Sequence, residues 1–259
     1  MSEHPRFLSL GDGNEVLQVA LGPGDGILAN ERAFIFRGLG LQQEVEHTGR
    51  LGRAIDWVGL KSDKVVKFTN EGTGPSYIGL AAPLPGKVIP IHLEKSGTLL
   101  AKPAMFLCSE TCNTITAEKM KLSPEGPFPQ HNVEMRKIAG AGMCYIQGCG
   151  AAVQKALGRG ESMVVEIGCV AAVSEACKIV AEERTGLIRE PPYSQGFTVK
   201  ITGPGCVFMQ STHPGRLLRA GRAERAGQRA LVGGEMGKAA MLTLVVLIVV
   251  LTLLEWEEI

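Results

Sequence analysis

The sequence predicts a mainly β fold, an antiparallel sandwich or barrel, on three observations. The 259 residues include 33 Gly and 14 Pro but only 20% charged residues, which indicates many turns and short elements. Short apolar runs alternate with these turn residues from about Leu8 to Gln210. One strand-and-turn unit also occurs twice. Closely spaced short strands favour a sandwich or barrel over a fold in which helices alternate with strands.

In the first half of the chain, each predicted strand is a short apolar run that ends at Gly, Pro or a polar turn residue. These runs are Val16–Leu21, Ile27–Ala29, Ala33–Phe36, Val65–Phe68, Tyr77–Leu80, Val88–Leu93, Thr98–Leu100 and Met105–Cys108. The polar segment that follows, Asn113–Gln130, contains Pro124, Pro127 and Pro129. It predicts a long loop.

The second half continues the pattern and adds a repetition. Its predicted strands are Met143–Ile146, Ala151–Val153, Ser162–Ile167, Val170–Val173, Phe197–Ile201 and Cys206–Met209. The stretches Gly140–Gln147 and Gly203–Gln210 both read Gly-x-Gly and then a strand that ends in Gln. Neither continues as G-x-G-x-x-G into a helix, which disfavours a nucleotide-binding loop. The repetition instead predicts a layered β architecture.

An arginine-rich stretch follows the β-rich body. Its arginines recur every three or four residues, so on a helix they share one face; they are Arg216, Arg219, Arg222, Arg225 and Arg229. Such a stripe can bind anionic lipid head groups or a protein partner, each lipid contact contributing about 1 kcal/mol. It can equally be a solvated linker helix. RNA binding is the weaker option, because no aromatic residues alternate with the arginines.

The C-terminal run 239–254 carries no charge, and its Val, Leu and Ile residues predict a transmembrane helix over residues 239–256. As a helix, the run spans roughly 24 Å. Lys238 and Trp256 flank it as residues of the membrane interface. The cations before the run and acids after it predict that the body lies on the cytosolic or an equivalent side. The alternative is a buried core helix or a pair of strands.

Catalytic and metal-binding signals are weak. Cys108 and Cys112 flank Glu110, and either His92 or His131 could approach them as the base of a thiol site. Other cysteines lie in apolar runs and are expected to be buried and inert; they are Cys144, Cys169, Cys177 and Cys206. The five histidines have no metal-binding spacing. We therefore predict no catalytic residue, no metal and no cofactor.

Several stretches resemble the altered-inheritance-of-mitochondria family, the mitochondrial biogenesis group with bacterial relatives. They are Ser76–Leu80, Pro85–Ile91, Ala101–Leu107, Gly142–Gln147, Gly160–Gly168 and Thr202–Ser211. The resemblance covers roughly Val16 to Ser211. It implies a TRAP-like β-sandwich related to the double-stranded β-helix, built from pseudo-repeats, which self-associates and acts in mitochondrial membrane organisation. It implies no catalytic residues.

Together these observations predict three parts: a TRAP-like β-sandwich over residues 8–212, an Arg-rich and possibly helical linker over 213–238, and the transmembrane helix over 239–256. The predicted function is a non-catalytic, membrane-tethered scaffold or assembly subunit in a mitochondrial membrane. Its expected partners are membrane lipid, proteins of a larger complex and further copies of itself. The balanced charge, 27 Lys and Arg against 26 Asp and Glu, does not favour nucleic acid. The alternative function is a ligand- or RNA-binding β module.

Overall fold

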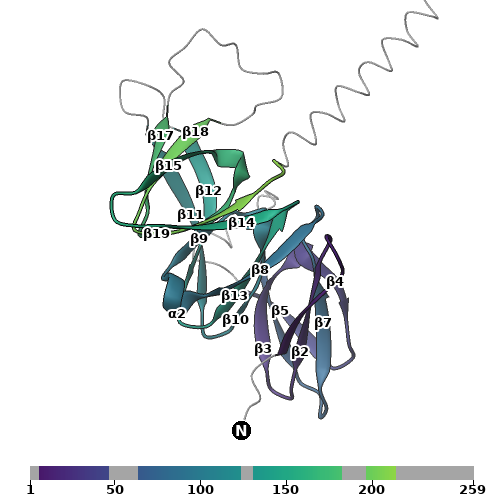
Figure 1. The fold of residues 1–259 in the computed structure, drawn as a ribbon. Coiled ribbons are helices and arrows are strands. Elements are labelled where there is room, and N and C mark those ends of the chain that lie inside the picture. The colour runs from purple at the N-terminus through teal and green to yellow at the C-terminus, as the bar shows by residue number, and fades with distance from the viewer. Residues whose placement is uncertain (1–5, 47–63, 124–130, 183–196, 214–259) are drawn as a thin grey trace, which may run out of the picture. The chain divides into compact units, whose positions relative to one another are not determined.

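Three consecutive repeats of one strand pattern build the β-rich body. The computed structural model describes residues 6–46, 64–123, 131–182 and 197–213 (Figure 1). Each repeat has two strands, a 3-10 helix, a third strand, a hairpin and a closing strand. The apolar runs and their Gly and Pro punctuation give this pattern, because each run is long enough for one short strand.

The elements follow in chain order. The first repeat, which the strand β1 (Arg6–Leu10) precedes, contains β2 (Val16–Leu21), β3 (Gly26–Asn30), η1 (Glu31–Ala33), β4 (Phe34–Arg37), β5 (Leu41–Glu46), β6 (Val65–Asn70) and β7 (Ser76–Leu80). The second contains β8 (Gly86–His92), α2 (Leu93–Ser96), β9 (Leu99–Ala101), η2 (Pro103–Met105), β10 (Phe106–Glu110), β11 (Thr114–Leu122), β12 (His131–Ala139) and β13 (Met143–Cys149). The third contains β14 (Ala152–Leu157), β15 (Ser162–Glu166), η3 (Ile167–Cys169), β16 (Val170–Ser174), β17 (Lys178–Glu182), β18 (Thr198–Thr202) and β19 (Gly205–Gln210).

The strands form four antiparallel sheets, which we name A to D. Sheet A has the order β1-β2-β7-β4, and sheet D has the order β15-β18-β17. Sheet B, with the order β5-β6-β3-β10-β13-β8, joins the first repeat to the second. Sheet C, with the order β11-β12-β9-β16-β19-β14, joins the second repeat to the third. Sheets B and C therefore share one construction.

A register shift recurs at the same place in every repeat. Where the third strand pairs with the closing strand, the shift falls between its first and third residues; these positions are Phe34 and Phe36 in β4, Phe106 and Cys108 in β10, and Val170 and Ala172 in β16. In each case a 3-10 helix comes directly before the strand. The extra residue of such a shift bends the strand locally. The three repeats are thus equivalent residue by residue around the 3-10 helix and the strand that follows it.

The core lies between the sheets and consists of side chains that alternate along the strands. In β2, Leu17, Val19 and Leu21 are buried while their neighbours are partly exposed, as expected for a sheet with one face against the core. Buried side chains from both repeats that sheet B joins pack in one cluster, for example Leu28 and Phe106. Burial of apolar side chains on both sides of a repeat junction stabilises the repeats against separation.

The mainly β fold class is confirmed, and each predicted apolar run lies within a strand or overlaps one. The predicted loop over 113–130 is wrong for Thr114–Leu122, which forms β11. Most β11 side chains are exposed, which suits the polar residues of this strand. Its backbone pairing with β12, rather than the burial of apolar side chains, keeps the strand extended. The TRAP-like classification stays a prediction.

The predicted linker 213–238 and transmembrane helix 239–256 lie outside the described residues, apart from His213. Within the described ranges, no helix is both long and apolar enough to cross a membrane. The division into these parts therefore stays a prediction.

Candidate interaction surface

The outer face of sheet A is apolar and exposed. The register places Leu8 of β1 opposite Gln18 of β2, and Gln18 opposite Gly79 of β7. Because the core face of β2 carries Leu17, Val19 and Leu21, the side chains in register with Gln18 point outward. We name this surface the sheet A face; its exposed apolar residues are Leu8, Leu10, Phe36 and Tyr77.

A glycine allows an aromatic ring to cover part of this face. Phe36 of β4 is paired with Gly79, and a Cβ built on Gly79 would lie 2.4 Å from the Phe36 ring. A side chain at position 79 would therefore displace the ring. The Phe36 ring also meets the Tyr77 ring edge to face, with centroids 6.1 Å apart. These two rings form a fixed aromatic pair on the sheet A face.

The strand β4 forms an edge of sheet A. Its neighbour on one side is β7, and among the described residues no strand pairs with its other side. All four β4 residues are exposed, including Phe34 and Ile35. An edge strand with unpaired backbone groups and exposed apolar side chains is a site where another strand can add.

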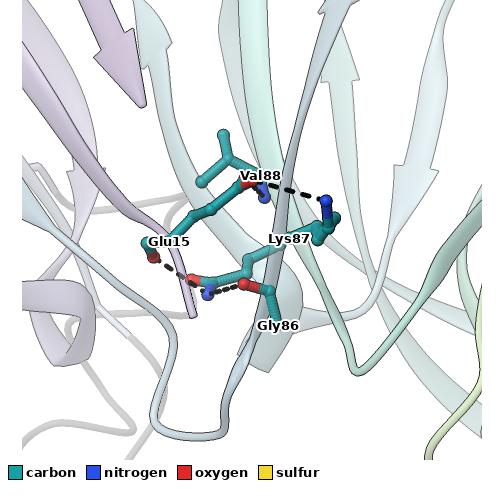
Figure 2. A network of polar contacts seen from close by, with 5 residues as sticks. Glu15, Gly86, Lys87 and Val88 are labelled. Atoms are coloured by element: carbon teal, nitrogen blue, oxygen red, sulfur yellow. Dashed lines mark hydrogen bonds and ion pairs between the residues drawn. The ribbon is translucent and has the colours of Figure 1, made fainter. Parts of the chain in front are cut away.

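A polar network connects β2, one of the strands of the sheet A face, to the second repeat. Figure 2 shows Glu15, next to β2, against the start of β8. The Glu15 carboxylate accepts a hydrogen bond from the Val88 backbone N–H at 2.7 Å, and its other oxygen lies 3.9 Å from the Lys87 ammonium. The Glu15 backbone N–H donates to the Gly86 carbonyl at 2.9 Å.

The side chain of Gln147 in β13 completes the network. Its amide nitrogen donates to the Glu15 and Gly86 carbonyls, both at 3.1 Å, and its oxygen accepts from the Ala82 backbone N–H at 2.5 Å. Gln147 is the last residue of one repeated stretch found in the sequence. A buried amide with these three partners satisfies backbone groups where two repeats meet. Its role is structural.

Lys102 occupies the corresponding junction between the second and third repeats. It precedes η2, and its ammonium donates to the carbonyl of Ile167 at 2.5 Å. Burial lowers the pKa of Lys102 to about 8, although Cys169, Glu166 and Cys149 nearby oppose that shift. An amine with this pKa is partly neutral near physiological pH.

Glu166, one of the groups that interact with Lys102, has a second acid–base side chain, His213, beside it. The Glu166 carboxylate is 3.7 Å from the His213 imidazole, and both side chains are largely buried. A Cβ on Gly168 would lie 1.6 Å from the His213 ring, so the ring packs directly on the backbone of η3. Sequence patterns did not reveal this cluster, because its members are far apart in the chain.

Cys108 and Cys112, considered from the sequence as a possible thiol site, differ in exposure: Cys108 is buried and Cys112 is exposed. Burial raises the pKa of Cys108 and that of Cys144, so both thiols stay protonated. Cys112 is exposed, and its sulfur lies 3.9 Å from the Glu110 carboxylate. His92, one of the two histidines considered as a base for such a site, is exposed on β8. Cys177 is buried as predicted, whereas Cys169 and Cys206 are only partly buried.

No group of three or more metal-ligating side chains occurs in the ranges that the structure describes. The residues predicted for lipid, partner or interface contact lie outside those ranges; they are Arg216, Arg219, Arg222, Arg225, Arg229, Lys238 and Trp256. Their roles stay predictions. The sheet A face was not predicted, since an apolar strand at a sheet edge has the same composition as one in a core.

Comparisons with known proteins agree with this architecture. The crystal structure of protein SPYM3_0169 from Streptococcus pyogenes is similar, with a TM-score of 0.67 over 86% of this chain and 100% of that chain. The sequence identity is 16%, so this likeness supports the fold alone. No curated protein matches the chain significantly.

A family model covers nearly the whole β-rich body. The model described as mitochondrial biogenesis AIM24 matches residues 7–212, which include all three repeats. This match confirms the family resemblance that the six sequence stretches carry. The chain therefore belongs to the mitochondrial biogenesis AIM24 family, and membership implies a role in mitochondrial biogenesis and an association with mitochondria.

Proposed function

We propose that this chain is a non-catalytic assembly subunit, tethered to a mitochondrial membrane, that binds protein partners through sheet A. The observation that supports this function most directly is the sheet A face with its open edge at β4. Exposed apolar clusters on folded domains mark surfaces for protein contact. The aromatic pair Phe36 and Tyr77 supplies large, rigid contact area, which suits an interface.

The C-terminal segment supplies the tether in this proposal. The apolar run 239–254 is uncharged, and a basic stretch precedes it. A membrane helix next to arginines would hold the β-rich body close to anionic lipid. In this arrangement the tail fixes the location and orientation of the subunit, while the sheets bind proteins.

Substitution of Tyr77 by Lys tests partner binding. The introduced ammonium would place a charge on the sheet A face, and burial of that charge in an interface is costly. We expect the native complex that contains the full-length chain to shift to lower mass on native electrophoresis of solubilised mitochondria. Val153→Lys is the matched control, because Val153 is exposed to a similar degree on β14.

A complex unchanged by Tyr77→Lys would contradict the proposed surface. Circular dichroism of the purified variant separates this result from misfolding. Carbonate extraction tests the tether independently: the full-length chain should stay in the membrane pellet, and a chain that ends at Lys238 should be extracted. Equal extraction of both chains would contradict the tether.

A further inference from the structure

The strand order contains a third junction sheet in two separate halves. In sheet B, three strands of the first repeat, β5-β6-β3, are followed by β10-β13-β8 of the second. In sheet C, β11-β12-β9 of the second repeat are followed by β16-β19-β14 of the third. By the same rule, β17-β18-β15 of the third repeat should be followed by the first-repeat strands β4-β7-β2. Sheet D supplies the first of these halves and sheet A supplies the other.

The side chains of β4 are more exposed than those of the equivalent strands, which have a neighbour on both sides. Ile35, the second residue of β4, is 49% exposed. Its equivalents after the other 3-10 helices, Leu107 in β10 and Ala171 in β16, are both 0% exposed. Those two strands each have a neighbour on both sides, whereas β4 has β7 alone among the described strands. The difference in burial therefore follows the difference in pairing.

The strand β15 of the third repeat is likewise more exposed than its equivalents in the other two repeats. Val164 is 52% exposed, whereas its equivalents Leu28 in β3 and Leu100 in β9 are 4% and 7% exposed. Both equivalents lie on strands that pair with the third strand of the following repeat. Within the described residues, β15 pairs with β18 alone.

We propose that the outer edge of β4 pairs antiparallel with β15 of a second copy of this chain, which forms a seven-stranded sheet β17-β18-β15-β4-β7-β2-β1 across two copies. This inference rests on the proposed function as an assembly subunit and specifies one partner. Burial of Phe34, Ile35 and Val164 would accompany the pairing, to the extent seen for their equivalents. The chain thus supplies both halves of its own interface.

The two complete junctions fix the register. At the first junction Ala29 pairs with Cys108, and Leu28 pairs with Ser109. At the second, Ala101 pairs with Ala172, and Leu100 pairs with Val173.

Counting from the 3-10 helices, Val165 is equivalent to Ala29 and Ala101, and Phe36 is equivalent to Cys108 and Ala172. The inferred interface therefore pairs Phe36 with Val165 and Arg37 with Val164. A head-to-tail contact of this kind produces a ring if the rotation closes and a filament if it does not.

Disulfide crosslinking between two differently tagged full-length copies tests the register. One copy carries Arg37→Cys and the other Val164→Cys, both in a Cys112→Ser background because Cys112 is an exposed native thiol. Directly opposed residues of an antiparallel pair have Cα atoms about 4.5–5.5 Å apart, within reach of a disulfide. We expect mild oxidation of the co-expressed proteins in gentle detergent to give a crosslinked heterodimer.

Two matched experiments test whether the crosslink is specific and intermolecular. Val153→Cys in place of Val164→Cys should give no heterodimer, since β14 belongs to sheet C. A chain with both Arg37→Cys and Val164→Cys should form a ladder of multimers. An intramolecular disulfide in that chain, or absence of the heterodimer, would overturn the inference.

The result is distinguishable from failure of the proposed function. If the heterodimer is absent while Tyr77→Lys still removes the native complex, the subunit assembles with a different protein and only the head-to-tail inference falls. If the wild-type chain gives neither a native complex nor a crosslink, the proposed function falls as well.

Discussion

At the scale of single residues, Lys102 links stability to pH. Burial lowers its pKa from 10.5 in the unfolded chain to about 8 in the folded one. Below about pH 8, folding therefore buries a charged amine at a cost. Between pH 8 and 10.5 the unfolded chain binds more protons than the folded chain at this residue, so the contribution of Lys102 to stability rises with pH.

We expect Lys102→Met to remove this pH dependence. The free energy of unfolding of the wild type minus that of Lys102→Met should rise between pH 7 and pH 9.5, by about 1.4 kcal/mol per unit above pH 8. Urea unfolding of both proteins across this range measures the difference. A difference that does not change with pH would contradict the lowered pKa.

Gly86 provides a second residue-scale prediction. A Cβ on Gly86 would lie 1.8 Å from the carbonyl oxygen of Gly148, a backbone atom of the paired strand β13. We expect Gly86→Ala to destabilise the protein by about 1–3 kcal/mol, because the two strands must separate. Urea unfolding at neutral pH measures the loss.

Gly74→Ala is the matched control for this substitution. A Cβ at Gly74 meets no atom within 4 Å, and its φ is not in the left-handed region. This variant should unfold within about 0.5 kcal/mol of the wild type. If Gly86→Ala has an equally small effect on stability, β8 and β13 do not approach each other as closely as the structure shows.

At the scale of elements, the sequence predicts the strands that are mainly apolar runs and misses those in which polar and apolar residues are mixed. The strands that were not predicted are β1, β5, β11, β12 and β17. In β5, the sequence Leu-Gln-Gln-Glu-Val-Glu has a mostly polar composition, and the strand forms an edge of sheet B. Pairing with a neighbour, which is not local in the sequence, decides the conformation of such strands.

For a related reason, the sequence shows the repeated stretch that ends in Gln in only two of the three repeats. The closing strands β13 and β19 both end their stretch in Gln, and each Gln satisfies buried backbone groups at a junction. In the first repeat Ala81 stands at the equivalent position, so the signature is lost. The candidate surface lies on this divergent repeat. Its edge position depends on the whole topology, which a pattern of single residues does not contain.

The arginine-rich segment gives the prediction at this scale. Replacement of all five arginines (216, 219, 222, 225 and 229) by Glu should reduce membrane association, because repulsion from anionic lipid replaces attraction. Flotation with vesicles that contain anionic lipid measures the fraction bound. Replacement of the same five residues by Lys keeps the charge and should retain binding. Unchanged flotation of the Glu variant would exclude a lipid role for this segment.

At the scale of the whole molecule, three repeats joined by two complete sheets leave one half-sheet at each end of the series. A fold of this kind can assemble with further copies, since the edge strand at one end can pair with the edge strand at the other end of a second copy. Membership of the mitochondrial biogenesis AIM24 family gives the setting in which such an assembly would act. The membrane segment would restrict copies to a surface, which raises their local concentration and favours head-to-tail contact.

If this chain is an assembly subunit, the purified full-length protein has a mass greater than that of one chain. Sedimentation velocity in gentle detergent should find species at multiples of the 27.6 kDa chain, and Val164→Lys should shift them to the monomer. A wild-type protein that sediments as a 27.6 kDa monomer at every concentration, alone and in mitochondrial extract, would contradict the account.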